Sequence, residues 1–260
     1  MERTLMKVVI FCGGQGTRLR EETEYKPKPM VEVGGRPILW HIMKSYAVYG
    51  FNEFILCLGY KQEHIRKFFL DYEQMNNDVT VHLNSKERTV HHQRHSENWT
   101  VTLVDTGLQT PKGRRLKMVE SYIDGDTFMV TYGDGVADVN IRELMAYHKA
   151  QKKIATFTGV HPVSRFATVN LNKRGKISAW KEKRQIEEYV NAGFFVFNRK
   201  IFDYLMKNEE LEESPMEKLT ARGQVAMFRH EGFWQCMDTY RDHQLLEGIW
   251  KSGKAPWKTW

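Results

Sequence analysis

The stretch Val8-Val9-Ile10-Phe11-Cys12-Gly13-Gly14-Gln15-Gly16-Thr17-Arg18-Leu19 predicts the fold of this chain, because an apolar run passes directly into a glycine-rich loop. The run is typical of a strand buried on both faces of a parallel sheet. Its loop then lies at the carboxyl end of the strand, where open α/β sheets bind ligands. Glycines let backbone N–H groups approach phosphate oxygens closely, so the loop predicts an anion-binding site.

Two cations strengthen this interpretation, since a glycine-rich loop alone can equally be a turn that binds nothing. Arg18 lies in the loop, and Lys28 follows in Lys26-Pro27-Lys28-Pro29-Met30. A guanidinium can bind two phosphate oxygens at once, and an ammonium places a compact charge on one phosphate. The third glycine of dinucleotide-binding folds is missing, and no GKS or GKT follows as in a P-loop. The spacing indicates another kind of nucleoside triphosphate site.

Strand-like and helix-like runs alternate along the chain, which predicts an α/β fold with a Rossmann-like, mostly parallel sheet flanked by helices. The strand-like runs lie at residues 7–12, 53–58, 79–83, 99–104, 127–132 and 154–160, and the helix-like runs at residues 38–49, 64–72 and 141–152. Short strands at residues 167–171, 177–181 and 193–197 predict a small β-rich region over one half of the cleft. Helices at residues 200–207, 216–222 and 239–251 close the chain.

Composition excludes several classes of protein. No apolar run reaches the length of about 18 residues that a membrane helix needs, and no apolar leader precedes the first strand, so we expect a cytoplasmic protein without membrane contact. The net charge is +7, but no basic stripe with interleaved aromatics is present, so we expect no nucleic-acid partner. The 3 cysteines are too widely spaced for a disulfide framework.

The glycine loop and the lysine–proline segment resemble GGxGTRL and KPKPM of the sugar-1-phosphate nucleotidyltransferases. Within that family the chain is similar to the cytidylyltransferases that act on glucose 1-phosphate. Further matching motifs lie at residues 34–43, 132–136, 191–195 and 232–239, so the resemblance covers nearly the whole chain. It implies transfer of a cytidylyl group from CTP to α-D-glucose 1-phosphate, giving CDP-glucose for deoxysugar or surface polysaccharide precursors. From its length we expect one domain over residues 1–260, with a nucleotide-binding half at about 1–160 and a sugar-binding and C-terminal part at about 161–260, and we expect a homo-oligomer.

The resemblance assigns roles on the nucleotide side. Arg18 and Lys28 would be catalytic, because the reaction needs positioning and charge neutralisation and no protein nucleophile. The nucleotide would be bound by Gly13, Gly14, Gly16, Thr17, Arg18, Lys28, Thr106 and Gly107.

On the metal and sugar side, the resemblance implies that Asp134 and Asp238 hold Mg²⁺, and that Glu182, Lys183 and Asn191 bind the sugar phosphate. Residue chemistry alone leaves alternatives open: Asp134 fits an Asp-Gly turn, Asp238 fits a helix cap, and Glu182 belongs to a run of charges that solvent could cover. Two other functions also stay open, namely a sister enzyme with another sugar phosphate or nucleotide, and a catalytically idle regulatory subunit.

The segment Thr110-Pro111-Lys112-Gly113-Arg114-Arg115-Leu116 departs most from the family pattern, which reads TMTGGRL and borders the sugar pocket. Lys112 and Arg114 add two cations there. If Arg114 points inward, it favours a sugar with an extra acidic group, and if it points outward, glucose 1-phosphate fits. We expect the outward orientation, because long charged side chains usually reach solvent.

Overall fold

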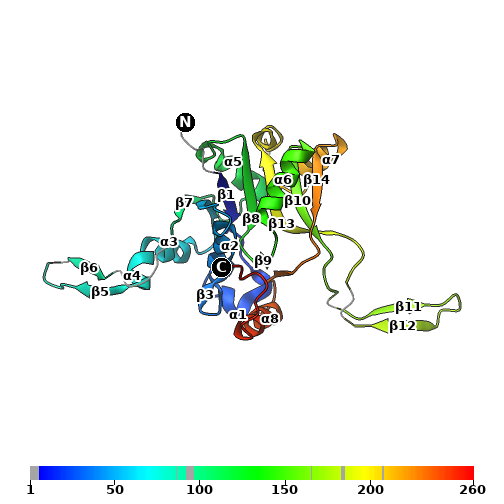
Figure 1. Cartoon of the computed structure of the whole chain (residues 1–260), viewed down its shortest axis with the longest axis horizontal. Coiled ribbons are helices and arrows are strands. Elements are labelled where there is room, and N and C mark those ends of the chain that lie inside the picture. The colour runs from blue at the N-terminus through cyan, green and yellow to red at the C-terminus, as the bar shows by residue number, and fades with distance from the viewer. Residues whose placement is uncertain (1–5, 86, 92–96, 165, 183–184, 207) are drawn as a thin grey trace.

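A seven-stranded sheet forms the centre of the molecule (Figure 1). The computed structural model describes residues 6–85, 87–91, 97–164, 166–182, 185–206 and 208–260. In spatial order the strands are β14 (Val225–Arg229), β10 (Ala155–Val160), β13 (Val190–Asn198), β8 (Thr127–Tyr132), β1 (Lys7–Phe11), β4 (Glu53–Leu58) and β7 (Thr100–Asp105). All run parallel except β13, so the predicted α/β fold is confirmed.

Strand β1 shows how the sheet is buried on both faces. Val8, Val9 and Ile10 have no exposed surface, and successive side chains of a strand point to opposite faces. The continuous apolar run therefore requires helices on both sides. Those packed with Val8 and Ile10 are α2 (Ile38–Ala47), α6 (Ile141–Gln151) and α8 (Tyr240–Lys251), and those packed with Val9 are α5 (Lys112–Met118) and α7 (Ser214–Ala221).

The other helical segments connect the strands. They are α1 (Arg20–Thr23), α3 (Gln62–Leu70), α4 (Tyr72–Asn76) and the 3-10 helices η1 (Thr17–Leu19), η2 (Lys28–Met30), η3 (Glu120–Tyr122) and η4 (Arg199–Tyr204). Within the described ranges, none of the helices combines the length and the apolar character that crossing a membrane requires.

In the described part of the chain, four antiparallel strand pairs lie outside the main sheet. They are β2 (Glu32–Val33) with β3 (Arg36–Pro37), β5 (Asp78–Val81) with β6 (Arg88–His91), β9 (Gly135–Ala137) with β15 (Trp234–Cys236), and β11 (Thr168–Leu171) with β12 (Ile177–Lys181). The β5–β6 and β11–β12 hairpins project from opposite sides of the body (Figure 1).

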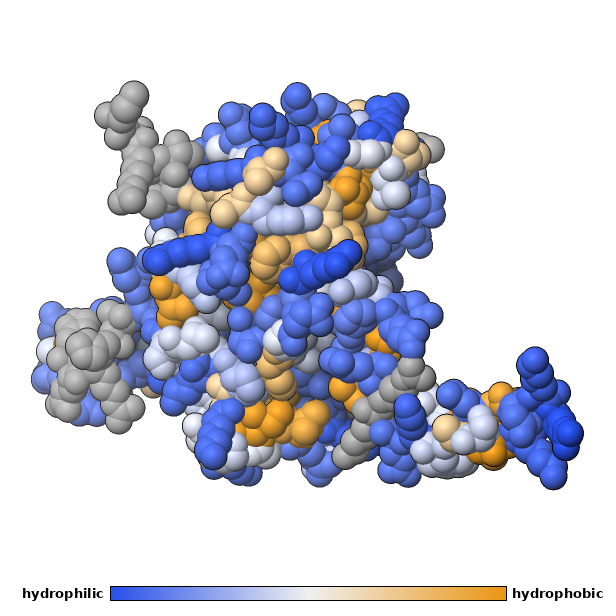
Figure 2. All heavy atoms as spheres, turned by 45° about the vertical axis from the view of Figure 1, so that its right-hand side comes forward, coloured by the Kyte–Doolittle hydropathy of each residue, from blue (hydrophilic) through white to orange (hydrophobic). Residues whose placement is uncertain are grey.

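The β11–β12 hairpin carries apolar side chains that water contacts. Leu171, Ile177 and Trp180 are 62%, 58% and 63% exposed. Figure 2 shows apolar side chains among hydrophilic ones on this projecting arm. Exposed apolar groups gathered on one projection are typical of a surface that contacts another protein.

Three predicted elements differ from the structure. Residues 79–83 do not join the main sheet but lie in the projecting β5–β6 hairpin, where alternate polar residues stay exposed. Residues 193–197 form part of β13 at the middle of the main sheet, and not of a separate β-rich region, because Phe194–Phe197 is an unbroken apolar run buried on both faces. The helix predicted over residues 200–207 is a 3-10 segment, Arg199–Tyr204, and not an α-helix, and residue 207 lies outside the described residues.

His41 fixes the C-terminal segment against α2. Its ring is fully buried, with Nε2 2.8 Å from the carbonyl oxygen of Val33 and Nδ1 3.4 Å from Nε1 of Trp257. An indole N–H can only donate, so Nδ1 accepts and the imidazole is neutral. Burial lowers the pKa of His41 to about 4.

This geometry predicts a loss of stability in acid. His41 has its ordinary pKa of 6.5 in the unfolded chain and a pKa of about 4 in the folded protein. The contribution of neutral His41 to the free energy of unfolding is therefore fully present above pH 6.5 and is lost as the pH falls toward 4. Between pH 7.5 and pH 5 the loss is about 2 kcal/mol. Urea unfolding of the wild type and of His41→Gln at both pH values measures it. An equal pH dependence in the two proteins would contradict this assignment.

Candidate active site

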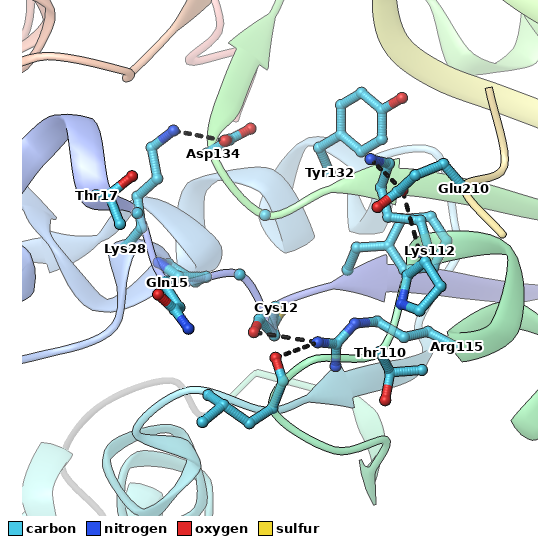
Figure 3. Close-up of a pocket in the computed structure, with 18 of the residues that line it drawn as sticks. Cys12, Gln15, Thr17, Lys28, Thr110, Lys112, Arg115, Tyr132, Asp134 and Glu210 are labelled. Atoms are coloured by element: carbon cyan, nitrogen blue, oxygen red, sulfur yellow. Dashed lines mark hydrogen bonds and ion pairs between the residues drawn. The ribbon is translucent and has the colours of Figure 1, made fainter. Parts of the chain in front are cut away.

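The carboxyl ends of β1 and β8 open into a pocket of about 650 Å³. Most of its lining comes from loops at this edge of the sheet (Figure 3). The lining residues are 11–18, 28–29, 108–112, 115, 132–134, 210, 212 and 238. The pocket therefore brings together the glycine loop, both predicted catalytic cations and both predicted metal ligands.

Gly16 turns the loop so that Thr17 and Arg18 enter the pocket. Its φ is +64°, a left-handed conformation that glycine adopts without strain. A Cβ at this position would also lie 2.8 Å from Cγ2 of Thr23. The Thr23 hydroxyl holds the turn, because it donates to the carbonyl oxygens of Gly16, at 3.1 Å, and Leu19, at 2.9 Å.

A buried arginine supports the glycine loop from the interior of the protein. The guanidinium of Arg115, which is 4% exposed, donates to the carbonyl oxygens of Leu58, Gly13 and Leu108 at 3.0, 3.3 and 3.2 Å, and to Oγ1 of Thr106 at 2.6 Å. A Cβ at Gly13 would lie 2.1 Å from Nη1 of Arg115. The loops that follow β1, β4 and β7 are thus tied to one cation.

No local pattern in the sequence sets Arg115 apart from its neighbours Lys112 and Arg114. Their positions on helix α5 place the three side chains in different surroundings. Arg115 and Leu116 face the core, and Arg114 is exposed and outside the pocket lining, so the outward orientation expected for Arg114 is confirmed. Lys112 lines the pocket.

Lys28 forms the charged centre of the pocket. Its Nζ lies 2.7 Å from Oδ2 of Asp134 and 2.6 Å from Oδ1 of Asp238, and Nη1 of Arg18 lies 3.2 Å from Oδ2 of Asp238. Burial alone would lower the pKa of Lys28, but the charge of Asp134 and the hydrogen bonds to both carboxylates raise it. Burial alone would raise the pKa of Asp238, but Lys28 and Arg18 lower it. Lys28 and Asp238 are therefore both charged at neutral pH.

Asp238 does not cap helix α8. Thr239 is the N-cap, and its hydroxyl accepts a hydrogen bond from the backbone N–H of Asp242, while the Asp242 side chain accepts from the backbone N–H of Thr239. This is a capping box, so the helix end is satisfied without the carboxylate of Asp238. The helix-cap interpretation of Asp238 is wrong, and its side chain belongs to the pocket.

The carboxylates of Asp134 and Asp238 form a donor set for a divalent cation. One ligand atom from each, together with Sγ of Cys236, lies within 4.8 Å of the others. The site already holds a positive charge, the ammonium of Lys28, between the two carboxylates. Hard cations such as Mg²⁺ take carboxylate oxygens, whereas a thiol is a soft ligand, so the two aspartates fit Mg²⁺ and Cys236 does not. Burial raises the pKa of Cys236, which keeps its thiol protonated.

The residues predicted for the sugar take different positions. Asn191 is the second residue of β13, and its Nδ2 donates to the hydroxyl of Tyr132, a residue of the pocket lining, at 3.1 Å. Glu182 is exposed and does not line the pocket, and Lys183 lies outside the described residues. Among the predicted nucleotide contacts, Thr106 is fully buried beneath the pocket and donates to the carbonyl oxygen of Leu58 at 2.7 Å. Gly107 follows it, outside the lining.

The chain is similar to several known proteins. The nucleotidyl transferase family model matches residues 7–237. Glucose-1-phosphate cytidylyltransferase of Salmonella typhimurium is 48% identical over 259 residues, which are 98% of this chain and 100% of that protein. Probable glucose-1-phosphate cytidylyltransferase of Bacillus subtilis is 43% identical, with 98% and 100% covered. The crystal structure of HddC from Yersinia pseudotuberculosis has a TM-score of 0.70 at 20% identity, covers 94% of this chain and 99% of its own, and shows a shared fold.

Removing the buried guanidinium should destabilise the protein. Arg115→Met removes one hydrogen bond from each of four oxygens, of which those of Leu58 and Gly13 keep other donors, and we expect a loss of about 2–3 kcal/mol in the free energy of unfolding. The neighbouring exposed Arg114→Ala should change it by less than about 0.5 kcal/mol. Chemical denaturation of the two variants makes the comparison, and equal stabilities would argue against the supporting role of Arg115.

Proposed function

The chain belongs to the nucleotidyl transferase family and, within it, to the glucose-1-phosphate cytidylyltransferases, and we propose that its pocket transfers a cytidylyl group from CTP to α-D-glucose 1-phosphate. The products are CDP-glucose and pyrophosphate. One geometric observation carries the proposal: Arg18, Lys28, Asp134 and Asp238 meet at the end of the glycine loop. This assembly of charges at a triphosphate-binding loop also argues against an idle regulatory subunit.

The reaction is an in-line attack of a sugar phosphate oxygen on the α-phosphorus of CTP. Negative charge builds on the α-phosphate and on the leaving pyrophosphate, so catalysis needs fixed positive charge at those atoms. Lys28 supplies a compact charge to the α-phosphate, and Arg18, at the mouth of the glycine loop, can bind two oxygens of the triphosphate. The backbone N–H groups of Gly13 and Gly14 would donate to the same phosphates.

Asp134 and Asp238 would hold Mg²⁺, which when bound neutralises phosphate charge and orients the triphosphate. Lys28 lies between the two carboxylates and offsets their mutual repulsion. The same side chain can reach the triphosphate, because the glycine loop and Lys28 line one pocket. We propose Glu182, Lys183 and Asn191 for the hexose 1-phosphate, on the strength of the family motifs.

The cellular setting is a further part of the proposal. The exposed apolar side chains of the β11–β12 hairpin support a homo-oligomer, which light scattering of the purified protein would test. A cytoplasmic location is supported by the free cysteines Cys12, Cys57 and Cys236, which reducing compartments maintain. CDP-glucose would then serve as a precursor of deoxysugars or surface polysaccharides.

The reaction is tested by pyrophosphate release with each of the four nucleoside triphosphates and several hexose 1-phosphates. We expect kcat/KM for CTP to exceed that for UTP at least about tenfold, because a site that pairs the cytosine amino group leaves polar groups unpaired with uracil. Equal use of CTP and UTP would instead favour a sister nucleotidyltransferase.

Asp238→Asn should lower kcat by roughly 10²-fold or more, since it removes an anionic ligand from a weakly held cation. Raised Mg²⁺ should restore part of the activity. The matched change Asp203→Asn, at an exposed position outside the pocket lining, should have no effect. Full activity of Asp238→Asn at ordinary Mg²⁺ would remove this residue from the metal site.

A further inference from the structure

Tyr132 is the last residue of β8 and lines the pocket (Figure 3). Strand β13 runs antiparallel beside β8, with Phe194 opposite Thr131, so the end of β8 meets the start of β13. The start of β13 is irregular, because its register against β10 shifts between Phe195 and Asn191. Such bulges often redirect a side chain next to a functional site. Here the irregular start of β13 places Asn191 within hydrogen-bond distance of Tyr132.

The ring of Tyr132 is fixed by packing. Gly193 has a φ of +84°, and a Cβ at this position would lie 2.4 Å from Cδ2 of Tyr132, so the ring lies directly against the backbone of β13. The rings of Phe11 and Phe195 also pack beside it, with centroid distances of 6.3 and 5.8 Å. The hydroxyl of Tyr132 is therefore held at a defined point of the pocket wall.

Two hydrogen bonds fix the amide of Asn191 in one orientation. Its Oδ1 accepts from the backbone N–H of Gly193 at 2.9 Å, and its Nδ2 donates to the hydroxyl oxygen of Tyr132 at 3.1 Å. A backbone N–H can only donate, so Oδ1 must face Gly193 and Nδ2 must face Tyr132. Within the described ranges, these two bonds leave one N–H of Nδ2 and one acceptor site of Oδ1 for a ligand.

Glu212 determines the direction in which the hydroxyl of Tyr132 donates. The hydroxyl donates to Oε1 of Glu212, so its oxygen is left to accept from Asn191. Burial and the charge of Glu212 raise the pKa of Tyr132, so the hydroxyl keeps its proton. The other carboxylate oxygen, Oε2, lies 3.3 Å from Nζ of Lys112, which holds Glu212 in place. A continuous set of contacts therefore joins Lys112, Glu212, Tyr132 and Asn191.

The two ends of this set of contacts lie on different halves of the sheet. Lys112 follows β7, on the half that also contains β1 and β4 and the predicted nucleotide contacts Thr106 and Gly107. Asn191 lies on β13, on the far side of β8 from these strands, and is proposed for the sugar phosphate. A change at the hydroxyl of Tyr132 should therefore affect the sugar phosphate through the amide of Asn191.

We propose that Tyr132 and Glu212 are positioning residues that hold Asn191 in the orientation in which its remaining N–H donates to the hexose 1-phosphate. This inference rests on the proposed function, which gives Asn191 to the sugar phosphate. Tyr132 acts through the amide that it orients and not on the reacting atoms. Loss of its hydroxyl lets the amide rotate, so the amide is held less often in the orientation that binds the second substrate.

Tyr132→Phe removes the hydroxyl and keeps the packed ring. At saturating CTP, its KM for glucose 1-phosphate should rise about fivefold, as expected for the loss of one hydrogen bond between neutral groups. Its KM for CTP should stay within about twofold of the wild-type value, because the nucleotide binds on the other half of the sheet. The matched control is Tyr204→Phe, which removes a hydroxyl that accepts from Arg222 outside the pocket lining and should change neither KM.

A double-mutant cycle tests whether the hydroxyl acts through Asn191. Asn191→Ala should raise the KM for glucose 1-phosphate at least as much as Tyr132→Phe does. Adding Tyr132→Phe to Asn191→Ala should raise it no further, because the amide that the hydroxyl orients is then absent. Glu212→Met should also raise this KM, and it should have no further effect in the Tyr132→Phe background.

The inference is overturned if the effects of Tyr132→Phe and Asn191→Ala multiply, since the hydroxyl then acts by another route. It is also overturned if Tyr132→Phe raises the KM for CTP as much as that for glucose 1-phosphate, which indicates a general structural role. An unchanged KM for glucose 1-phosphate in Asn191→Ala removes Asn191 from the sugar site and overturns it as well. Failure of the proposed function looks different, because the wild type would then form no CDP-glucose.

Discussion

The contact of Lys28 with Asp134 and Asp238 constrains the rest of this structure. It joins residues that are 106 and 210 positions apart in the chain, from η2, the end of β8 and the segment before α8. Two carboxylates this close repel each other strongly in a partly buried site, and the ammonium between them offsets that repulsion. The loop after β1, the β9–β15 pair and the start of α8 must all be placed so that the three charges meet. The fold thus gathers two carboxylates and two cations at one point of the pocket.

Arg115 supports the loops around this charged centre from the interior of the protein. The guanidinium of Arg115 is buried, and burying a charge without hydrogen-bond partners is unfavourable. Its N–H groups donate to four neutral oxygens at the ends of β1, β4 and β7. Because these loops share the guanidinium of Arg115 as a donor, a movement of one loop breaks its hydrogen bond to Arg115 or moves the guanidinium away from the other loops. Gly13 is required here for space, as Gly16 is required for its backbone conformation.

Charge varies along the pocket. Lys28 and Arg18 stand at the phosphate end. Glu210 and Glu212 line another wall, where Lys112 forms ion pairs with both and the charge of Arg115 also acts on Glu210.

The local sequence determined the α/β class and the core of the site. Buried parallel strands need continuous apolar runs, and parallel strands bring their carboxyl ends to one edge, so the pattern of residues by itself places Gly13–Arg18, Lys28 and Asp134 together. Only the tertiary structure decided the partners of the remaining charges. It made Arg115 a buried support, Arg114 a solvent-exposed neighbour and Lys112 an ion pair with Glu210, although the three cations lie within four positions of one another. The physical reason is that the effect of a charge depends on its burial and on acceptors that lie far away in the sequence, which a local pattern does not contain.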